Sequence, residues 1–180
     1  LINVIRTNGN DNILLATAQG MAICFNENDV RCMGRDAAGV RGISLNEGDY
    51  VVGAEKMEEG KTLLTVTENG YGKRTALPEY LRTGPDGEKI PQSRGGKGLK
   101  NYNITPKTGN IAGCRVVGDN DDVMIIENGG VIIRTPAASI NVYKRDVQGV
   151  IVMRVDEGNK VVSLERVEQD EELEAQETQE

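Results

Sequence analysis

The segment Val-Met-Ile-Ile-Glu-Asn-Gly-Gly-Val-Ile-Ile, residues 123–133, decides the fold class of this chain. Two runs of β-prone residues flank the turn signal Asn128-Gly129-Gly130, which is the pattern of a tight hairpin. The same pattern occurs twice more: Leu63 to Thr67 precedes Glu68-Asn69-Gly70, and Ile13 to Thr17 precedes Ala18-Gln19-Gly20. The sequence therefore predicts three related hairpins in an all-β protein.

These hairpins belong to longer repeats. A shift of 110 residues places the chain on itself without a gap, so that Gly20 meets Gly130 and Gly48 meets Gly158. A third copy lies between them, with hairpin Gly70 and loop glycines at 95 and 109. The outer copies space their glycines by 19 and 9 residues, whereas the middle copy uses 25 and 14. The middle copy has therefore gained about six residues around Gly84-Pro85-Asp86-Gly87 and five in the next loop.

Each repeat has the size of one propeller blade. About fifty residues with four short strands is typical of such a blade. We expect three blades of a larger ring within residues 1–167, at approximately 1–50, 51–110 and 111–167. Since Leu1-Ile2 align with Ile111-Ala112, we expect the chain to start in a strand, and Val161–Val167 to form another. Strand edges left open in such an array would favour self-association.

The charge of the chain is unevenly distributed. The sequence has 28 acidic and 21 basic residues, for a net charge of −7, but 168–180 contain seven acids and no base, which leaves 28 − 7 = 21 acids against 21 bases. We expect 168–180 to be a disordered acidic tail; the alternative is a mimic of DNA that competes for a basic surface. The rest of the chain is neutral, so the net charge does not exclude a nucleic-acid partner.

Several classes of chemistry are disfavoured by residue content. Three cysteines without C-x-x-C spacing fit a reducing cytoplasm, and no apolar run approaches the roughly 20 residues of a membrane span. The absence of histidine removes the commonest general base. The acidic segment 119–122 resembles part of a calcium loop but lacks the glycine and glutamate that such a loop needs. We expect no metal site, no cofactor site, no membrane partner and no catalytic residue in this chain.

The segment Gln92-Ser93-Arg94-Gly95-Gly96-Lys97-Gly98 is the strongest candidate for a binding site. Its glycines would let the backbone approach a phosphate, and Arg94, Lys97 and the nearby Lys100 would neutralise phosphate charge. A nucleotide-binding P-loop is excluded, because Gly98 stands where Ser or Thr would hold magnesium. The simpler interpretation is a flexible, soluble loop.

Basic residues recur at matching positions of the other copies. A first set lies in the equivalent loops, at Arg35, Arg41, Lys144 and Arg145; a second lies just past the hairpin glycines, at Lys73, Arg74 and Arg134. Repeats would place each set along one rim of the array, where a bent phosphate backbone could run. The few aromatic residues favour duplex over single-stranded nucleic acid. Alternatively, these are solvated charges at strand ends.

The candidate DNA-binding residues are therefore Gln92, Arg94, Gly95, Gly96, Lys97, Gly98, Lys100, Arg35, Arg41, Lys73, Arg74, Arg134, Lys144 and Arg145.

Three motifs together resemble one known family. Gly-Val-Arg-Gly-Ile-Ser-Leu at 39–45, the stretch 67–75 and the stretch 148–154 are similar to the later blades of bacterial DNA gyrase A subunits. Gln92 to Gly98 resembles the family's seven-residue box, Gln-Arg/Lys-Arg-Gly-Gly-Arg/Lys-Gly, with Ser93 replacing one basic residue. The family's most complete box normally lies in the first blade, so this copy is expected to be secondary.

The resemblance implies a β-pinwheel, a propeller-like ring with altered strand connectivity, whose basic perimeter bends duplex DNA. It further implies partnership with the gyrase B subunit in an A2B2 enzyme that introduces negative supercoils, in the bacterial cytoplasm at the nucleoid. ATP, magnesium and the cleavage tyrosine belong to other regions of that enzyme, so no tyrosine of this chain is expected to be catalytic. The alternatives are the corresponding domain of topoisomerase IV, from its gyrase-A-like polypeptide, and a propeller-like protein-interaction module.

Overall fold

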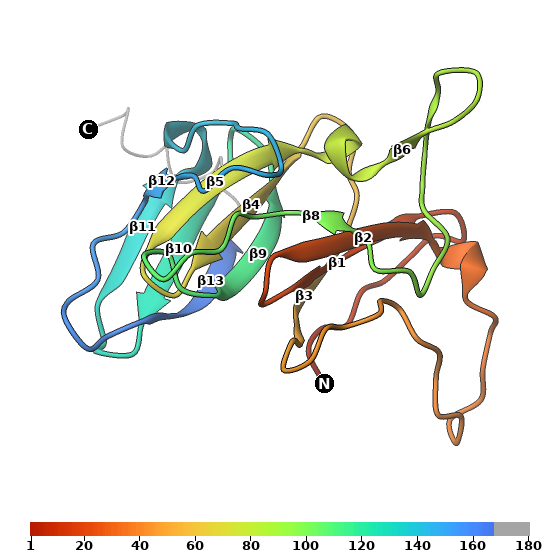
Figure 1. Cartoon of the computed structure of the whole chain (residues 1–180), viewed down its shortest axis with the longest axis horizontal. Helices are drawn as coiled ribbons and strands as arrows, with labels where there is room; N and C mark the ends of the chain where they lie inside the picture. Colours follow the sequence, from red (N-terminus) through yellow and green to blue (C-terminus); the bar gives the residue numbers. More distant parts are fainter. Residues whose placement is uncertain (168–180) are drawn as a thin grey trace, which may run out of the picture.

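The computed structural model describes residues 1–167, and its regular structure consists of antiparallel strands and three short 3-10 helices. The strands form three main sheets that follow one another along the molecule (Figure 1). No helix in residues 1–167 could cross a membrane. The all-β prediction is confirmed, whereas the acidic tail predicted at 168–180 lies outside the described residues.

Each main sheet is built around one of the three predicted hairpins. The first sheet has the order β3-β1-β2-β8, with β1 (Asn12–Thr17), β2 (Met21–Asn26), β3 (Val51–Lys56) and β8 (Leu99–Lys100). The second has the order β12-β5-β4-β9, with β4 (Thr62–Thr67), β5 (Tyr71–Ala76), β9 (Ile111–Val117) and β12 (Val150–Ile151). The third has the order β11-β10-β13, with β10 (Asp122–Glu127), β11 (Ile132–Pro136) and β13 (Val161–Val167).

The hairpins repeat in detail. Gly20, Gly70 and Gly130 close the turns with φ of +88°, +76° and +94°, a conformation that strongly favours glycine. A 3-10 helix follows each hairpin: η1 (Glu27–Asp29), η2 (Leu77–Tyr80) and η3 (Ala137–Ser139). The middle copy adds a small hairpin of β6 (Arg82–Thr83) and β7 (Lys89–Ile90), which is formed by its inserted residues.

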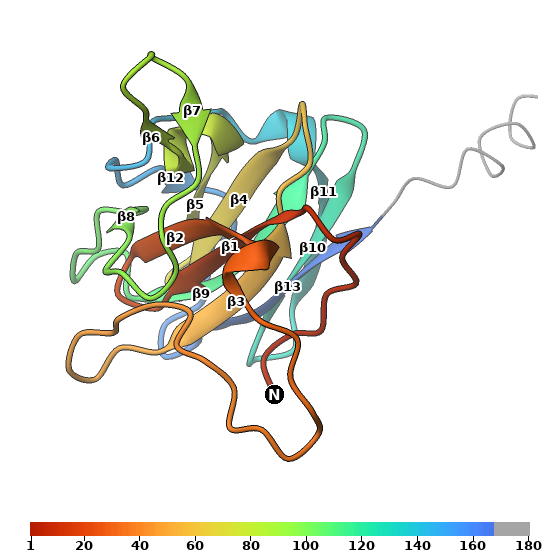
Figure 2. The same ribbon diagram turned by 90° about the vertical axis from the view of Figure 1, so that its right-hand side faces the viewer.

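Neighbouring repeats exchange short strands. Strand β8 follows the second hairpin in sequence but pairs with β2 of the first, as Figure 2 also shows; β12 pairs with β5 in the same way. Because the outer strand of each of the first two sheets comes from the following repeat, these sheets do not coincide with the sequence units. The third sheet consequently has three strands within residues 1–167. The unit boundaries near 50 and 110 stay a prediction.

Strand pairing corrects the alignment of the middle repeat. Leu99 pairs with Ala22 as Val150 pairs with Gly72, so Gly98, rather than Gly95, is equivalent to Gly149. Gly98 also shares the positive φ of Gly149, +74° against +73°. The hairpin-to-loop spacing of the middle copy is then 98 − 70 = 28 residues, nine more than in its neighbours. The three glycines of the Arg94–Gly98 loop, at 95, 96 and 98, made the sequence alignment ambiguous.

The expected strand at Leu1-Ile2 is wrong. Residues 1–8 have no strand assignment, and Leu1 is fully exposed. The equivalent strands β9 and β13 pair with β4 and β10, the first strands of their own sheets' hairpins. A strand at this repeat position therefore pairs on a hairpin, and Leu1 and Ile2 have no strand partner within residues 1–167.

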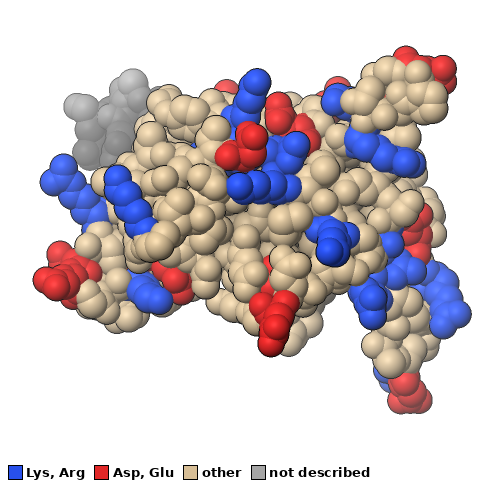
Figure 3. Space-filling view, viewed as in Figure 1, with Lys and Arg blue, Asp and Glu red and all other residues tan. Residues whose placement is uncertain are grey.

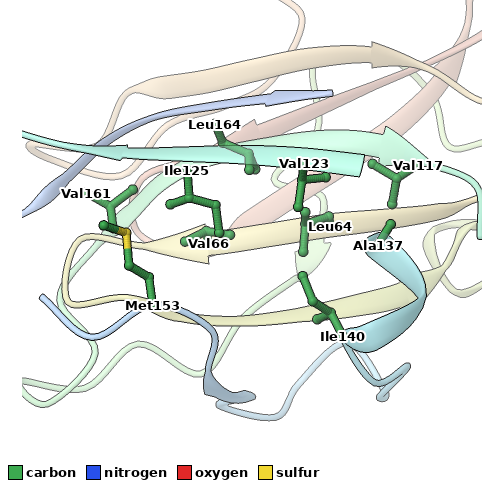
Figure 4. Close-up of a cluster of buried hydrophobic side chains, with 10 residues drawn as sticks. All are labelled: Leu64, Val66, Val117, Val123, Ile125, Ala137, Ile140, Met153, Val161 and Leu164. Atoms are coloured by element: carbon green, nitrogen blue, oxygen red, sulfur yellow. The ribbon is translucent and has the colours of Figure 1, made fainter. Parts of the chain in front are cut away.

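The core lies between consecutive sheets. One cluster joins the second and third sheets through Leu64, Val66, Val123, Ile125 and Leu164, among others (Figure 4). A second joins the first and second sheets and includes Leu14, Leu63 and Val116. The inner strands approach closely at glycines: a Cβ on Gly53 would lie 2.6 Å from the sulfur of Cys114. These clusters hold the three sheets in a row. The loops that join the strands carry most of the predicted basic residues.

Candidate nucleic-acid interface

The loop that contains the predicted box is anchored at its start by Gln92. The amide of Gln92 donates to the carbonyl of Cys24 at 2.7 Å, and its side-chain Nε2 donates to the carbonyl of Tyr80 at 3.1 Å. The first bond reaches β2 of the preceding sheet, and the second reaches η2 of its own repeat. The half-buried Gln92 therefore fixes the start of the box loop against the protein.

Arg94 holds two loops together. Its Nε donates to the carbonyl of Asp29 at 2.9 Å, and its Nη1 donates to the carbonyl of Arg41 at 2.6 Å. The amide of Gly95 donates to the carbonyl of Gly42 at 2.8 Å, and Ser44 Oγ donates to the carbonyl of Gly95 at 2.7 Å. The guanidinium of Arg94 is thus directed at protein carbonyls, and the box loop is bound to the 29–44 loop of the preceding repeat.

Gly98 permits the close approach of β8 to β2. A Cβ at this position would lie 2.2 Å from the carbonyl oxygen of Ala22, closer than any side chain allows. The equivalent Gly149 shows the same restriction, at 2.4 Å from the carbonyl oxygen of Gly72. Gly95, with φ of +84°, has more room, and Gly96 is exposed. The glycines of the box therefore serve loop docking; the carbonyl of Gly96 accepts from the amide of Ser44 at 2.8 Å, although the residue itself is exposed.

Four predicted cations face solvent and have no protein partner among the described residues. Lys97 lies in the box loop, Arg35 and Arg41 in the equivalent loop of the first repeat, and Lys144 in that of the third. Lys100 is also exposed, with its Nζ donating to Asn103 Oδ1 at 2.9 Å. Unpaired exposed cations keep their full charge available to a polyanion.

Arg145 repeats the arrangement of Arg94. Its Nη1 donates to the carbonyl of Lys100 at 2.7 Å, just as Arg94 donates to the carbonyl of Arg41. Its Nε lies 3.9 Å from Glu79 Oε2. Glu79 occupies in the second repeat the position that Asp29, the partner of Arg94, occupies in the first. Arg94 and Arg145 therefore each clamp their loop to the preceding repeat, whereas the equivalent Arg35 is exposed and makes no such contact within residues 1–167.

The second predicted set divides between interior and surface. Lys73 is fully buried: its Nζ donates to the carbonyls of Lys144, at 2.6 Å, and of Arg145, and lies 5.2 Å from the centre of the Tyr102 ring. Burial lowers the pKa of Lys73 to about 8. Lys73 therefore supports the loop that presents Lys144 and does not itself face solvent.

Arg74 and Arg134 occupy the same repeat position but differ in exposure. Arg74 is 5% exposed; its Nε donates to the carbonyl of Ile140 at 2.7 Å, and its Nη1 binds Asp119 Oδ1 at 2.5 Å. The Arg134 side chain is 57% exposed and binds Asp122 Oδ2 through Nε at 2.6 Å. The acidic segment 119–122 thus pairs with three arginines, since Asp121 also lies 4.0 Å from Nη1 of Arg166, and Asp121 closes a turn by accepting from the amide of Gly118.

Sequence reasoning missed two cations beside the predicted set. Arg82 and Lys89 lie on β6 and β7, the two strands of the inserted hairpin, and line, with Arg145, an open surface cavity of about 430 Å³. Glu79 lies in the same cavity. The signal available in the sequence was that the insertion, Gly84 to Gly87, has a basic residue on each side. These residues extend the basic surface of the middle repeat.

Basic side chains are distributed in groups over one face of the molecule. Figure 3 shows Lys and Arg gathered where the 29–44 loop projects, with further groups along the molecule and acidic residues between them. In residues 1–167 no group of three or more His, Cys, Asp or Glu is placed to hold a metal ion. The arrangement is suited to binding an extended polyanion at several separated points.

Comparison with known proteins places the chain among topoisomerase domains. It matches the family model described as "DNA gyrase C-terminal domain, beta-propeller" over residues 11–56, 61–90, 88–118 and 121–168. It is 43% identical over 172 residues to the gyrase A protein of Staphylococcus epidermidis and 40% identical over 167 residues to that of Escherichia coli. These alignments cover 94% and 93% of this chain but 18% of each relative.

Solved structures show the same fold. The C-terminal domain of DNA topoisomerase IV superposes with a TM-score of 0.83 at 27% identity, covering 98% of this chain and 54% of that one. The C-terminal domain of DNA gyrase A superposes with a TM-score of 0.78 at 27% identity, covering 89% of this chain and 52% of that one.

Proposed function

The chain belongs to the family of DNA gyrase C-terminal domains, and we propose that it binds duplex DNA along the loops that join its sheets. The observation that carries this proposal is the set of exposed, unpartnered cations, Arg35, Arg41, Lys97 and Lys144, which occupy the equivalent loop in all three repeats. Phosphates spaced along a duplex would bind such a row at successive points, with release of counterions.

The basic residues would have two different roles, contact with DNA and positioning of the loops. Phosphate would be contacted by the side chains of Lys97 and Lys100 and by the backbone amide of Gly96. Arg94 and Arg145 would hold the loops in place, since their guanidinium groups already donate to backbone carbonyls. Lys73 and Arg74 would act from the interior in the same way. Specificity would depend on how readily a sequence bends, because the candidate contacts are to the DNA backbone.

In the complete protein, we propose, these contacts wrap DNA for ATP-dependent negative supercoiling. The chain spans about a fifth of the length of its curated gyrase A relatives, so strand cleavage and the binding of ATP and magnesium would belong to other regions. The partner would be gyrase B in an A2B2 assembly, in the bacterial cytoplasm. Retention of a box-like motif favours gyrase over topoisomerase IV.

The experiment is a salt series of binding to a duplex of about 40 base pairs, long enough to contact several loops. Lys97→Ala should weaken binding and reduce the slope of log affinity against log salt by about 1, because one phosphate contact is lost. Lys61→Ala is the matched control: Lys61 lies outside the basic loops and pairs with Glu58 at 2.7 Å.

An unchanged slope for Lys97→Ala would contradict the assignment of this residue. Absence of binding by the folded wild-type chain would contradict duplex binding by these three repeats and would favour the protein-interaction alternative. Wrapping needs a separate measurement, namely the change in linking number when nicked circular DNA is sealed in the presence of the protein.

A further inference from the structure

The middle repeat carries a hairpin that the other two repeats lack. Strands β6 and β7 follow η2 and precede β8, and they pair through Arg82 with Ile90 and Thr83 with Lys89. In the first repeat no strand lies between η1 and β3, and in the third none lies between η3 and β12. The hairpin projects from the molecule beside η2 (Figure 1). The additional residues of the middle repeat therefore build a defined structural element.

Basic and acidic side chains occupy different parts of this hairpin. Arg82 and Lys89 lie on its two strands and are exposed, whereas Asp86 and Glu88 lie in the turn and next to it. Figure 3 shows acidic side chains at the end of the projecting hairpin and basic ones nearer the body of the molecule. A polyanion would therefore be repelled by the tip of the hairpin and attracted to its base.

The base of the hairpin faces the basic loop of the third repeat. Arg82 and Lys89 line the open cavity of about 430 Å³ together with Arg145, which belongs to that loop. Leu99, on β8 directly after the box loop, also lines the cavity. The cavity therefore lies where the second and third repeats meet, and it joins the box loop to the next basic loop.

Positive charge predominates in this cavity. Its lining residues include the three cations and one carboxylate, that of Glu79. Oε2 of Glu79 lies 3.9 Å from Nε of Arg145, which is beyond hydrogen-bond distance. Nε of Arg82 and Nζ of Lys89 donate to neutral oxygens, at 3.2 and 3.0 Å. One carboxylate cannot neutralise three cations, so the cavity is suited to an anion.

Arg145 is less completely hydrogen-bonded than its equivalent in the preceding repeat. Nε and Nη1 of Arg94 both donate to protein carbonyls. Nη1 of Arg145 donates to the carbonyl of Lys100, but its buried Nε has no hydrogen-bond acceptor among residues 1–167. The charge of this guanidinium is therefore only partly compensated by the protein, and an anion in the adjoining cavity would stabilise it.

We propose that Arg82 and Lys89 bind a phosphate of the DNA backbone in this cavity, with Arg145 adding to the positive potential. This site rests on the proposed binding of duplex DNA and gives the middle repeat a contact that the other two repeats lack. The phosphate lies between those held by Lys97 and Lys144, because the cavity joins their loops. The contact is to the backbone, so it strengthens binding without selecting a base sequence.

The test is a salt series of binding between the full chain and a duplex of about 40 base pairs. Arg82→Ala/Lys89→Ala should weaken binding on the order of tenfold and reduce the slope of log affinity against log salt by about 1, because one neutralised phosphate is lost. Lys56→Ala/Lys61→Ala is the matched control. It removes the same charge from two lysines outside the basic loops, which pair with Asp11 at 3.9 Å and Glu58 at 2.7 Å, and its slope should equal that of the wild type.

A change at Glu79 should act in the opposite direction. Glu79→Gln removes the carboxylate of the cavity and keeps the size of the side chain, so binding should strengthen by roughly twofold as repulsion of the phosphate is lost. The gain should disappear when Arg82 and Lys89 are also alanine, because no phosphate is then held beside Glu79. A gain of equal size in both backgrounds would contradict a phosphate in this cavity.

The outcomes separate this site from the proposed function. If the wild type binds DNA and Arg82→Ala/Lys89→Ala keeps its affinity and slope, the hairpin site is overturned and the proposed function stands. If the wild type does not bind DNA, both are overturned. A control that weakens binding as much as the hairpin variant would reveal an effect of net charge alone and would also overturn the site. Circular dichroism checks that each variant is folded.

Discussion

Two lysines of this chain, Lys97 and Lys73, both belong to sets of cations that recur at fixed repeat positions, yet they have opposite environments. Lys97 faces solvent in the box loop, whereas Lys73, on β5, is fully buried beneath the loop that carries Lys144. The same division separates Arg134 from Arg74 at one repeat position. Charge and position in a repeat therefore do not define a DNA contact; the loop packed over the residue determines whether it faces a ligand or the protein interior.

The largest expected effect concerns stability at the Arg74 position. Arg74→Met should lower the free energy of unfolding by about 3 kcal/mol, because the buried carbonyl of Ile140 loses its donor and Asp119 loses its partner. Arg134→Met should cost less than about 1 kcal/mol, since Arg134 is mostly exposed. Urea unfolding of the two variants measures the difference, and equal losses would contradict the distinction.

The second effect distinguishes two glycines of the middle repeat. Gly98→Ala should cost about 2 kcal/mol, because it combines a positive φ with a clash against the carbonyl of Ala22. Gly87→Ala, in the inserted hairpin, should cost about 1 kcal/mol, because its φ is also positive but the space around it is open. Thermal unfolding measures which variant loses more stability. A larger loss for Gly87→Ala would show that β8 does not need the close approach of Gly98 to Ala22.

The smallest effect is the pH dependence caused by Lys73. Its pKa is about 8 in the folded chain and near 10.4 in an unfolded one. Between these values the unfolded state binds more protons, so the contribution of Lys73 to stability rises with pH. Burial raises the thiol pKa of Cys24 and Cys114 to about 12, which acts in the opposite direction above about pH 8.5.

The difference between wild type and Lys73→Met isolates the lysine from the thiols. The unfolding free energy of the wild type should rise relative to that of the variant by on the order of 1 kcal/mol between pH 7 and about 10. Urea unfolding at both pH values measures it. A difference that does not change with pH would mean that the amine of Lys73 is accessible to water in the folded chain.

Much of the fold could be predicted from residue types that act locally. The turn at Gly130, the β-prone runs on either side and the 110-residue shift were sufficient to predict three hairpins in an all-β array. The strand at Leu1-Ile2 could not be predicted correctly, because strand formation depends on a partner edge elsewhere in the chain. The alignment at Gly95 failed for a related reason, since strand pairing identifies Gly98 as the equivalent glycine.

Residue order along this chain is enough to establish its repeats, its turns and the positions of its basic loops, because those features follow from short-range backbone preferences. The partners of each cation follow from contacts between distant segments: Arg94 meets Asp29 across 65 residues, and Lys73 meets Lys144 across 71. Exposure and pairing are properties of the folded chain, since a charge becomes buried or free only when another repeat packs over it.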